Sequence, residues 1–287
     1  MKTEVNIIHN RIARVFPRKT NVTPDDELAF IACAPPRNIQ DISAVHISVA
    51  FTYDIPRAMR LERRWRVLGV PVQIGGPAFD APGGEFMPGM YVKNGYVITS
   101  RGCPNSCWFC SVPKREGPLR ELQIHDGWNI MDDNLLACSD GHILSVFDML
   151  KRQEKRPVLS GGLEAARLKS WHVDLIRKTK VQRMYFAYDT PDDYEPLLQA
   201  GKLLREGGIT VTSHRACCYV LIGYKGDTFE RAESRLNQTI QAGFMPYAML
   251  YRDRDGIYDP DWRRFQRQWV RPQFVGARMK SVPLILP

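Results

Sequence analysis

Three cysteines lie close together in the chain and could bind a soft metal. In the segment TSRGCPNSCWFCSVP, Cys103, Cys107 and Cys110 have C-x3-C-x2-C spacing directly after an apolar stretch with strand character. Such closely spaced thiolates suit iron–sulfur clusters or zinc. A closed structural zinc site takes four ligands, and three cysteines would leave one iron of a cubane cluster without a protein ligand. The spacing therefore predicts a metal site with one open coordination position, where a substrate could bind.

The residues around these cysteines favour a loop that wraps around a metal. Pro104 and the following Asn105 and Ser106 prevent a regular helix from starting between the first two cysteines. Gly102 allows the backbone to approach closely. We therefore expect a binding loop rather than a helix at this position.

Other uses of the thiols stay open. Zinc would need a fourth ligand, which His125 could supply, and a closed electron-transfer cluster would need a fourth thiolate. The odd count of seven cysteines argues against a disulfide framework. We interpret the remaining four as small buried hydrophobic residues. They are Cys33, Cys138, Cys217 and Cys218.

The composition is that of an ordinary globular protein. The chain has 287 residues, of which 44% are hydrophobic and 25% charged. No stretch reaches about 18 uncharged apolar residues, and the first residues lack the features of a secretory signal. We expect a cytoplasmic protein without a membrane partner, in a compartment where thiols stay reduced. The net charge of +9 favours an anionic partner such as nucleic acid, although a solubilising surface explains it equally well.

Strand and helix patterns alternate along most of the chain. Strands are expected at 96–100, 128–131, 156–160, 183–188, 209–223 and 245–251, and helices at 141–153, 171–180, 192–206 and 228–242. This alternation predicts an α/β fold with a parallel sheet and helical crossovers. The segment is too short for a complete eight-unit barrel, which typically needs about 250 residues. A partial (β/α)6 TIM-like barrel is therefore expected, with its chemistry at the C-terminal ends of the strands.

A smaller unit precedes this region. A strand at 44–51, a helix at 56–68 and a strand at 70–76 form a βαβ unit, which a Gly/Pro-rich linker follows. Residues 1–43 are rich in turn formers and are interpreted as mainly loops. We divide the chain into an N-terminal α/β unit with its linker (1–90), a barrel core (91–251) and a basic, aromatic C-terminal extension (252–287).

The cysteine motif, placed after the first strand of a partial barrel, resembles the signature of the radical S-adenosylmethionine (radical SAM) superfamily. The resemblance covers about residues 95–251 and implies a [4Fe–4S] cluster on Cys103, Cys107 and Cys110. It also implies S-adenosylmethionine bound at the open iron, and an external electron donor such as a flavodoxin- or ferredoxin-like protein. In that family the reduced cluster cleaves S-adenosylmethionine to methionine and a 5′-deoxyadenosyl radical, which removes a hydrogen from the substrate. The cofactor carries this chemistry, and the protein positions it.

The resemblance further implies a set of cofactor-binding residues. Phe109 would lie against the adenine. Asp132 and Asp133, after the second strand, are candidates for binding the substrate amino group, although they could instead cap the following helix. Asp189 would contact the ribose or the methionine part. The fifth-strand motif that borders the adenine is matched loosely by Leu221, Ile222 and Gly223.

The N-terminal unit resembles, weakly, the degenerate cobalamin-binding or methylthiotransferase-type domains that precede some radical SAM barrels. Two departures count against full function in this chain. It has no Asp-x-His-x-x-Gly motif for a lower cobalamin ligand, and only Cys33 precedes Cys103 where a second cluster would need three cysteines. We interpret the unit as a structural remnant or a substrate platform.

Two arginine-rich stretches could contact phosphate. One lies on the expected N-terminal helix and contains Arg57, Arg60, Arg63, Arg64 and Arg66. The other, near the C-terminus, alternates with aromatic residues and contains Arg263, Arg264, Arg267 and Arg271. We interpret the first stretch as a solvent-exposed helix face. We interpret the second as the solvent-exposed face of a helix whose aromatic residues pack against the rest of the protein.

The sequence therefore predicts a radical SAM enzyme. The basic charge and the arginine–aromatic stretch suggest nucleic-acid or nucleotide modification, while a peptide or a small metabolite would fit the motif equally well. The alternative function is a non-catalytic zinc- or nucleic-acid-binding module.

Overall fold

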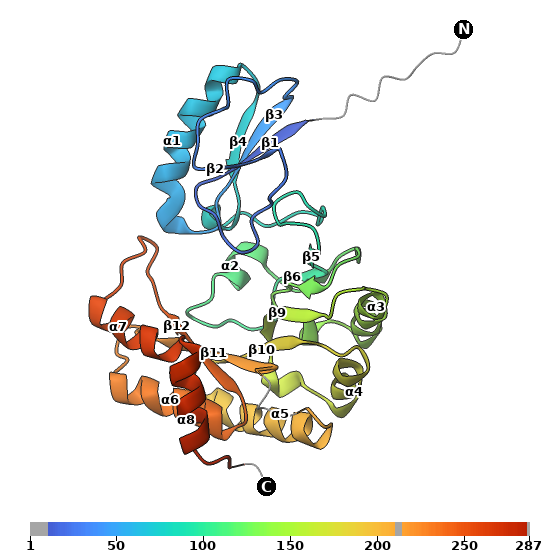
Figure 1. The fold of residues 1–287 in the computed structure, drawn as a ribbon, viewed down its shortest axis with the longest axis vertical. Coiled ribbons are helices and arrows are strands. Elements are labelled where there is room, and N and C mark those ends of the chain that lie inside the picture. The colour runs from blue at the N-terminus through green and yellow to red at the C-terminus, as the bar shows by residue number, and fades with distance from the viewer. Residues whose placement is uncertain (1–10, 210–213, 286–287) are drawn as a thin grey trace. The chain divides into compact units, whose positions relative to one another are not determined.

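The computed structural model describes residues 11–209 and 214–285. The chain divides into two compact units, Met1–Asn94 and Gly95–Pro287. Both units contain parallel sheets with helical crossovers (Figure 1), so the α/β class predicted from the sequence is confirmed.

The first unit is a four-stranded parallel sheet with one long helix. Its strands are β1 (Ile12–Phe16), β2 (Ala29–Ile31), β3 (Ala44–Ser48) and β4 (Val72–Gly75), in the order β2-β1-β3-β4. Helix α1 (Ile55–Trp65) connects β3 to β4 and buries Ala58, Leu61 and Trp65 against the sheet. These three residues recur at helical spacing, so one face of α1 forms the core and the rest of the helix is free to be polar. Short 3-10 turns flank the helix and the last strand; they are η1 (Thr52–Asp54), η2 (Arg66–Leu68) and η3 (Pro77–Phe79).

Strands β1 and β2 lie in the segment that the sequence presents as loops. In β1 the apolar pattern is broken by Arg14, which is nonetheless buried. Its guanidinium is paired with Asp26 and donates a hydrogen bond to the carbonyl of Gly89 at 2.8 Å. Because of this buried arginine, the sequence of a core strand has the pattern of a polar segment.

The second unit contains a six-stranded sheet in which every neighbouring pair is parallel. The strands are β5 (Tyr96–Val97), β8 (Asn129–Ile130), β9 (Val158–Leu163), β10 (Arg183–Tyr188), β11 (Ala216–Ile222) and β12 (Met245–Leu250). The order β12-β11-β10-β9-β8-β5 follows the chain, and β5 and β12 are the two edges. All six expected strands are present, but of the fifth predicted strand (209–223) residues 210–213 lie outside the described part of the chain.

Helices connect successive strands of this sheet. They are α3 (Asp140–Lys151), α4 (Ser170–Lys178), α5 (Tyr194–Glu206) and α6 (Phe229–Gln241), and they lie along one side of the sheet (Figure 1). Three 3-10 turns, η4 (Leu135–Ala137), η5 (Ala165–Arg167) and η6 (Pro191–Asp193), follow the ends of β8, β9 and β10. The alternation along β11 shows the two faces: Cys218, Val220 and Ile222 are fully buried, whereas Tyr219 and Leu221 are half-buried.

The first expected strand of this unit divides into two short pieces. Residues 96–97 belong to the main sheet, whereas β6 (Ser100–Arg101) pairs antiparallel with β7 (Arg120–Glu121), a strand that the sequence did not suggest. The cysteine segment and the short helix α2 (Val112–Glu116) lie between β6 and β7. This small two-stranded sheet therefore closes the base of the cysteine loop.

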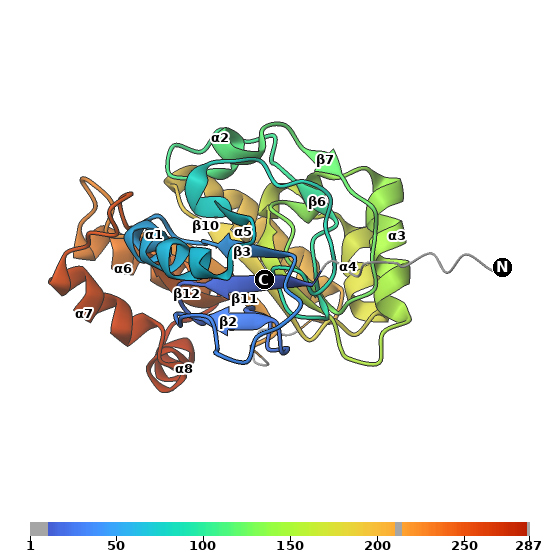
Figure 2. The same ribbon diagram turned by 90° about the horizontal axis from the view of Figure 1, so that it is seen from above.

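Two helices follow the last strand and pack beside one another against β12 (Figures 1 and 2). They are α7 (Pro260–Trp269) and α8 (Pro272–Ser281). Trp269 is fully buried, and Gln266 donates a hydrogen bond to the carbonyl of Ala248 in β12 at 2.9 Å. Trp262 packs on Phe229 of α6, with ring centroids 4.4 Å apart. The aromatic residues thus anchor α7, while Arg264, Arg267 and Arg271 are exposed.

Candidate functional site

The cysteine loop occupies residues 102–111. Cys103 and Cys110 are half-buried, Cys107 is exposed, and none of the three forms a disulfide. The amide of Cys110 donates to the carbonyl of Cys107 at 3.1 Å, which makes a tight turn between the last two cysteines. Burial raises the pKa of both thiols, and the neighbouring cysteines raise it further by charge repulsion.

The entry to the loop is held by Gly102 and Asp133. Gly102 has a φ of +84°, and a Cβ at this position would lie 2.4 Å from the carbonyl oxygen of Pro118. Its amide donates to the carboxylate of Asp133 at 2.9 Å. The other oxygen of Asp133 lies 3.6 Å from the guanidinium of Arg115. Glycine is therefore required here, and the end of β8 fixes where the loop begins.

An ion-pair network lies beneath the loop. The buried carboxylate of Glu116 accepts from Arg115 and Arg120, both at 2.9 Å, and lies 3.7 Å from Arg101. Three guanidinium groups around one buried carboxylate satisfy its desolvated oxygens. The network joins β6, α2 and β7, so both ends of the cysteine loop are fixed to the same base.

Asp132 is committed to the protein itself. Its side chain is buried and accepts hydrogen bonds from the Thr99 amide at 2.6 Å, the Thr99 hydroxyl at 2.6 Å and the Ser100 hydroxyl at 2.8 Å. Burial raises the pKa of Asp132, and these hydrogen bonds oppose the shift. Asp132 therefore holds the end of β5 against the end of β8. Neither Asp132 nor Asp133 caps the following helix α3, because its N-cap is Ser139.

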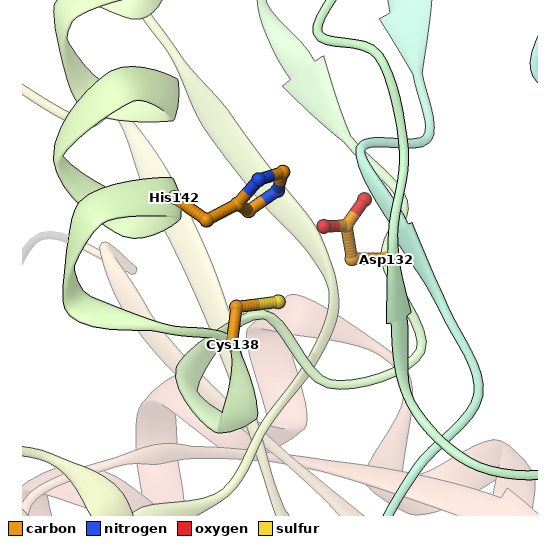
Figure 3. A group of neighbouring side chains, drawn as sticks. All are labelled: Asp132, Cys138 and His142. Carbon is orange, nitrogen blue, oxygen red and sulfur yellow. The ribbon is translucent and has the colours of Figure 1, made fainter.

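Asp132 also belongs to a compact buried trio with Cys138 and His142 (Figure 3). One ligand-type atom from each residue lies within 4.8 Å of the other two. His142 is 3.2 Å from the Thr99 hydroxyl through Nε2, and its Nδ1 lies 3.7 Å from the carboxylate of Glu121. Burial raises the pKa of Cys138 to about 11, so this thiol stays protonated. We interpret the trio as a hydrogen-bonded packing cluster, because Asp132 already has three donors.

Asn134 contacts Cys103, and Glu164 contacts Asn134. The amide nitrogen of buried Asn134 lies 3.5 Å from Cys103 Sγ and 2.7 Å from Glu164 Oε2. Glu164 also accepts from Arg167 Nε at 2.6 Å, and Asn134 Oδ1 is buried without a hydrogen-bond partner among the described residues. An unsatisfied buried acceptor beside a thiol suits a ligand that carries an N–H group. The rule that chemistry lies at strand ends selects the segments that contain Asn134 and Glu164, but the sequence assigned neither residue to a ligand.

A close approach of two strands makes this arrangement possible. Strand β9 continues through Gly161 and Gly162 to Leu163, so the glycines lie within the strand rather than after it. A Cβ on Gly161 would lie 2.0 Å from the carbonyl oxygen of Asp132. Because Gly161 has no side chain, the end of β9 can reach the end of β8 and bring Glu164 to Asn134.

Asp189 follows directly after the end of β10. Its Oδ1 accepts from the amide of Leu221 at 3.0 Å, which ties β10 to β11. Burial raises the pKa of Asp189 to about 7, and the neighbouring Asp193 adds to the shift. The charge of Asp189 in turn adds to the raised pKa of Cys107.

The three residues predicted to border the adenine do not lie on one face of the sheet. Leu221 is half-buried on the same face as Tyr219, whereas Ile222 is fully buried on the opposite face. Gly223 has a φ of +72°, and a Cβ there would lie 2.8 Å from Leu250 and 3.0 Å from Trp262. The structure therefore brings Leu221 and the Gly223 turn toward the strand ends but leaves Ile222 in the core.

Aromatic contacts connect the cysteine loop with the far strands. Trp108 meets Phe109 and Tyr224 edge to face at 5.4 Å, and Tyr251 at 6.0 Å. Tyr224 follows β11. Tyr251 follows β12, which is the edge strand farthest from β5. Together with the contacts that Asp133 and Asn134 make with the loop, these aromatic contacts show that the loop lies among the C-terminal ends of the strands.

The open face of the sheet carries three tyrosines. Tyr185 stacks on Tyr219 with centroids 4.8 Å apart, and Tyr219 meets Tyr247 edge to face at 5.8 Å. Burial raises the pKa of Tyr219 above its usual range, so its hydroxyl stays protonated. Tyr247 and Met249 are each 41% exposed. This face thus presents a partly exposed aromatic surface to a ligand.

Comparison with known proteins bears on the fold. No protein-family model and no curated protein matches this sequence. Among solved structures, the chain is similar to the radical S-adenosylmethionine methyltransferase TsrM from Kitasatospora setae, which was solved with cobalamin and a [4Fe–4S] cluster bound. The TM-score is 0.60, the match covers 83% of this chain and 74% of that chain, and the sequence identity is 12%. The chain therefore shares the fold of that enzyme.

No helix in the described part of the chain is long and apolar enough to cross a bilayer.

Proposed function

We propose that this protein is a radical SAM enzyme whose open parallel sheet is a partial (β/α)6 barrel. The observation that carries the proposal is the position of the cysteine loop among the C-terminal ends of the strands, in a chain with the fold of a radical SAM methyltransferase. Catalytic groups of β/α barrels lie at this end of the strands. The spacing, the loop and the fold thus point to the same chemistry.

The residues present fit a thiolate-bound iron–sulfur cluster better than a single zinc ion. Among the described residues, the trio that converges to single-ion distances is Asp132, Cys138 and His142, and it does not include the cysteine loop or His125. A cubane needs ligands that surround a larger body than one ion does. We therefore assign Cys103, Cys107 and Cys110 as the cluster ligands, with one iron left open.

The bound cluster would supply the electron that cleaves S-adenosylmethionine to methionine and a 5′-deoxyadenosyl radical. An external reductant must provide that electron, and the exposed Cys107 and Trp108 mark a side of the loop that such a donor can approach. Phe109, beside the third cysteine, is proposed to pack on the adenine, together with Leu221 and the Gly223 turn.

Recognition of the amino acid part of S-adenosylmethionine is assigned to Asn134 and Glu164. Asn134 Oδ1 has no partner among the described residues, and the Glu164 carboxylate is adjacent. An ammonium group donates up to three hydrogen bonds, which these two acceptors can receive. Asp133 fixes the entry to the loop instead, and Asp132 holds the end of β5 against the end of β8. Asp189 is proposed to hold β11 in register beside the ribose.

The test is anaerobic incubation of the reconstituted protein with S-adenosylmethionine and dithionite. We expect about four irons with matching sulfide per chain, and 5′-deoxyadenosine as a product. Cys107→Ala should lose both. Cys33 is exposed, so the expectation that it is buried is wrong, and Cys33→Ala serves as a matched change of another exposed cysteine that should keep both. One zinc per chain without iron would support a structural metal module and refute the proposal. S-adenosylhomocysteine without 5′-deoxyadenosine would indicate methyl transfer and refute radical cleavage.

A further inference from the structure

The first unit carries a concentration of arginine on helix α1. Four arginines lie within the eleven residues of α1, and Arg66 follows directly. The segment contains no lysine. Its single acidic residue, Glu62, pairs with Arg66 at 2.7 Å. The remaining guanidinium groups are therefore not neutralised within the helix.

Three of these arginines share one side of the helix. Arg57, Arg60 and Arg64 line a hollow of about 210 Å³, together with Leu61 of the same helix and Ala32 after β2. All three are exposed, and within the described residues none makes an ion pair or hydrogen bond. The helical repeat spreads them over about 10 Å along the axis. They form a row of unpaired guanidinium groups beside a hollow.

We propose that this row, Arg57, Arg60 and Arg64, binds the sugar–phosphate backbone of a nucleic acid. Guanidinium groups bind phosphate oxygens in a bidentate manner, and a site made of arginine alone suits that geometry. A duplex carries one negative charge per about 1.7 Å of its axis, so the row faces several phosphates at once. The contacts are to the backbone and carry no sequence preference.

The position of the apolar residues favours nucleic acid over a lipid surface. A helix that binds in a membrane interface inserts its apolar face into the bilayer. The apolar face of α1, formed by Ala58, Leu61 and Trp65, is already buried in the core of its own unit. Met59, which is 44% exposed, is too small an apolar area to insert into a bilayer. The helix thus offers charge and a hollow but no continuous apolar face to a partner.

The proposal goes beyond the assignment of radical chemistry and does not depend on it. Binding is measured without turnover, so its failure leaves the cluster and 5′-deoxyadenosine formation untouched. Conversely, a chain without a cluster could still bind nucleic acid through the first unit.

The experiment is fluorescence anisotropy of the full reconstituted protein with a labelled 20-base-pair duplex of random sequence, titrated from 50 to 300 mM salt. The test variant is Arg57→Gln/Arg60→Gln/Arg64→Gln. The matched control is Arg264→Gln/Arg267→Gln/Arg271→Gln, which removes the same charge from exposed arginines of α7 and its end. Far-ultraviolet circular dichroism and iron content verify that both variants stay folded.

We expect the test variant to lose about tenfold or more in affinity at 0.1 M salt, and its salt slope to fall by about two to three. The control should bind within about threefold of the unchanged protein. An equal loss in both variants would show that net charge alone drives binding and would overturn the proposal. So would an unchanged test variant, no binding at 50 mM salt, or arginine-dependent binding to anionic lipid vesicles but not to the duplex.

Discussion

The loop after β11 is fastened to helix α6 by a buried ion pair. Arg235 Nη2 lies 2.8 Å from Asp227 Oδ2 and donates to the carbonyl of Leu221 at 2.9 Å, while Asp227 also accepts from the amide of Gly223 at 2.9 Å. The side chains of Arg235 and Asp227 are 6% and 0% exposed. The Arg235 guanidinium lies over the ring of Tyr224, 5.3 Å from its centroid. One arginine therefore holds the loop that contacts Trp108 of the cysteine loop.

Replacing Arg235 with Met should lower the free energy of unfolding by about 3–5 kcal/mol, the usual cost of leaving one partner of a buried pair uncompensated. The Met side chain fills much of the same volume, so the loss comes from the carboxylate of Asp227, which keeps one backbone donor. A large part of this cost should disappear in the double variant Arg235→Met/Asp227→Leu, because it removes both charges. The double variant still loses the hydrogen bond to Gly223, which is worth about 1 kcal/mol.

The assay is urea denaturation followed by circular dichroism, with the midpoint and the slope fitted for each variant. Three proteins are compared with the unchanged chain: the two above and Asp227→Leu, which completes the cycle. A loss below about 1 kcal/mol for Arg235→Met would refute the reasoning. A double variant as unstable as the single one would show that the cost comes from lost packing rather than from an unpaired charge.

Three further changes test other contacts of the site. Burial raises the pKa of Asp189 to about 7, so the stability that its protonated form contributes is present at low pH and is lost as pH rises through 7. Asn cannot ionise, so between pH 5 and 8 the free energy of unfolding of Asp189→Asn should rise by about 2–3 kcal/mol relative to that of the unchanged chain in urea titrations. Gly161→Ala should cost about 1–3 kcal/mol, since its Cβ would lie 2.0 Å from the carbonyl of Asp132, whereas Gly162→Ala, with its nearest atom at 4.0 Å, should be far milder in the same assay. Asp133→Ala should release iron to a chelator faster than Asp133→Asn, because the amide side chain still accepts the hydrogen bond that fixes the entry to the cysteine loop; equal release rates would contradict that role.

Local patterns in the sequence were sufficient for the elements whose side chains alternate cleanly. Strand β10 and helix α1 bury residues at the spacing that each period requires, so they were predictable. Strand β1 was not, because Arg14 interrupts its apolar run and is satisfied by Asp26, twelve residues away. Strand β7 has two residues and exists through its pairing with β6. Such elements depend on tertiary partners that no local window contains.

In the candidate site, too, some residues could be predicted from local sequence and others depend on partners far away in the chain. The spacing of Cys103, Cys107 and Cys110 is local and indicated a metal loop directly. The use of Asp132 was not visible, because its partners Thr99 and Ser100 lie 33 and 32 residues earlier in the chain. The rule that strand ends carry chemistry selected the right segments, but it did not distinguish a carboxylate that holds the backbone from one that faces a ligand.

The charges around the cysteine loop are consistent with an anionic cluster. Three thiolates bring negative charge to this position, and nearby carboxylates would oppose it unless they are paired or neutral. Asp133 lies beside Arg115, and the pKa of Asp189 near 7 allows that group to hold a proton at neutral pH. Asn134 adds an N–H donor 3.5 Å from the sulfur of Cys103. Hydrogen bonds to cluster sulfurs and the local net charge set the reduction potential, so the same contacts that position the loop would also make the bound cluster easier to reduce.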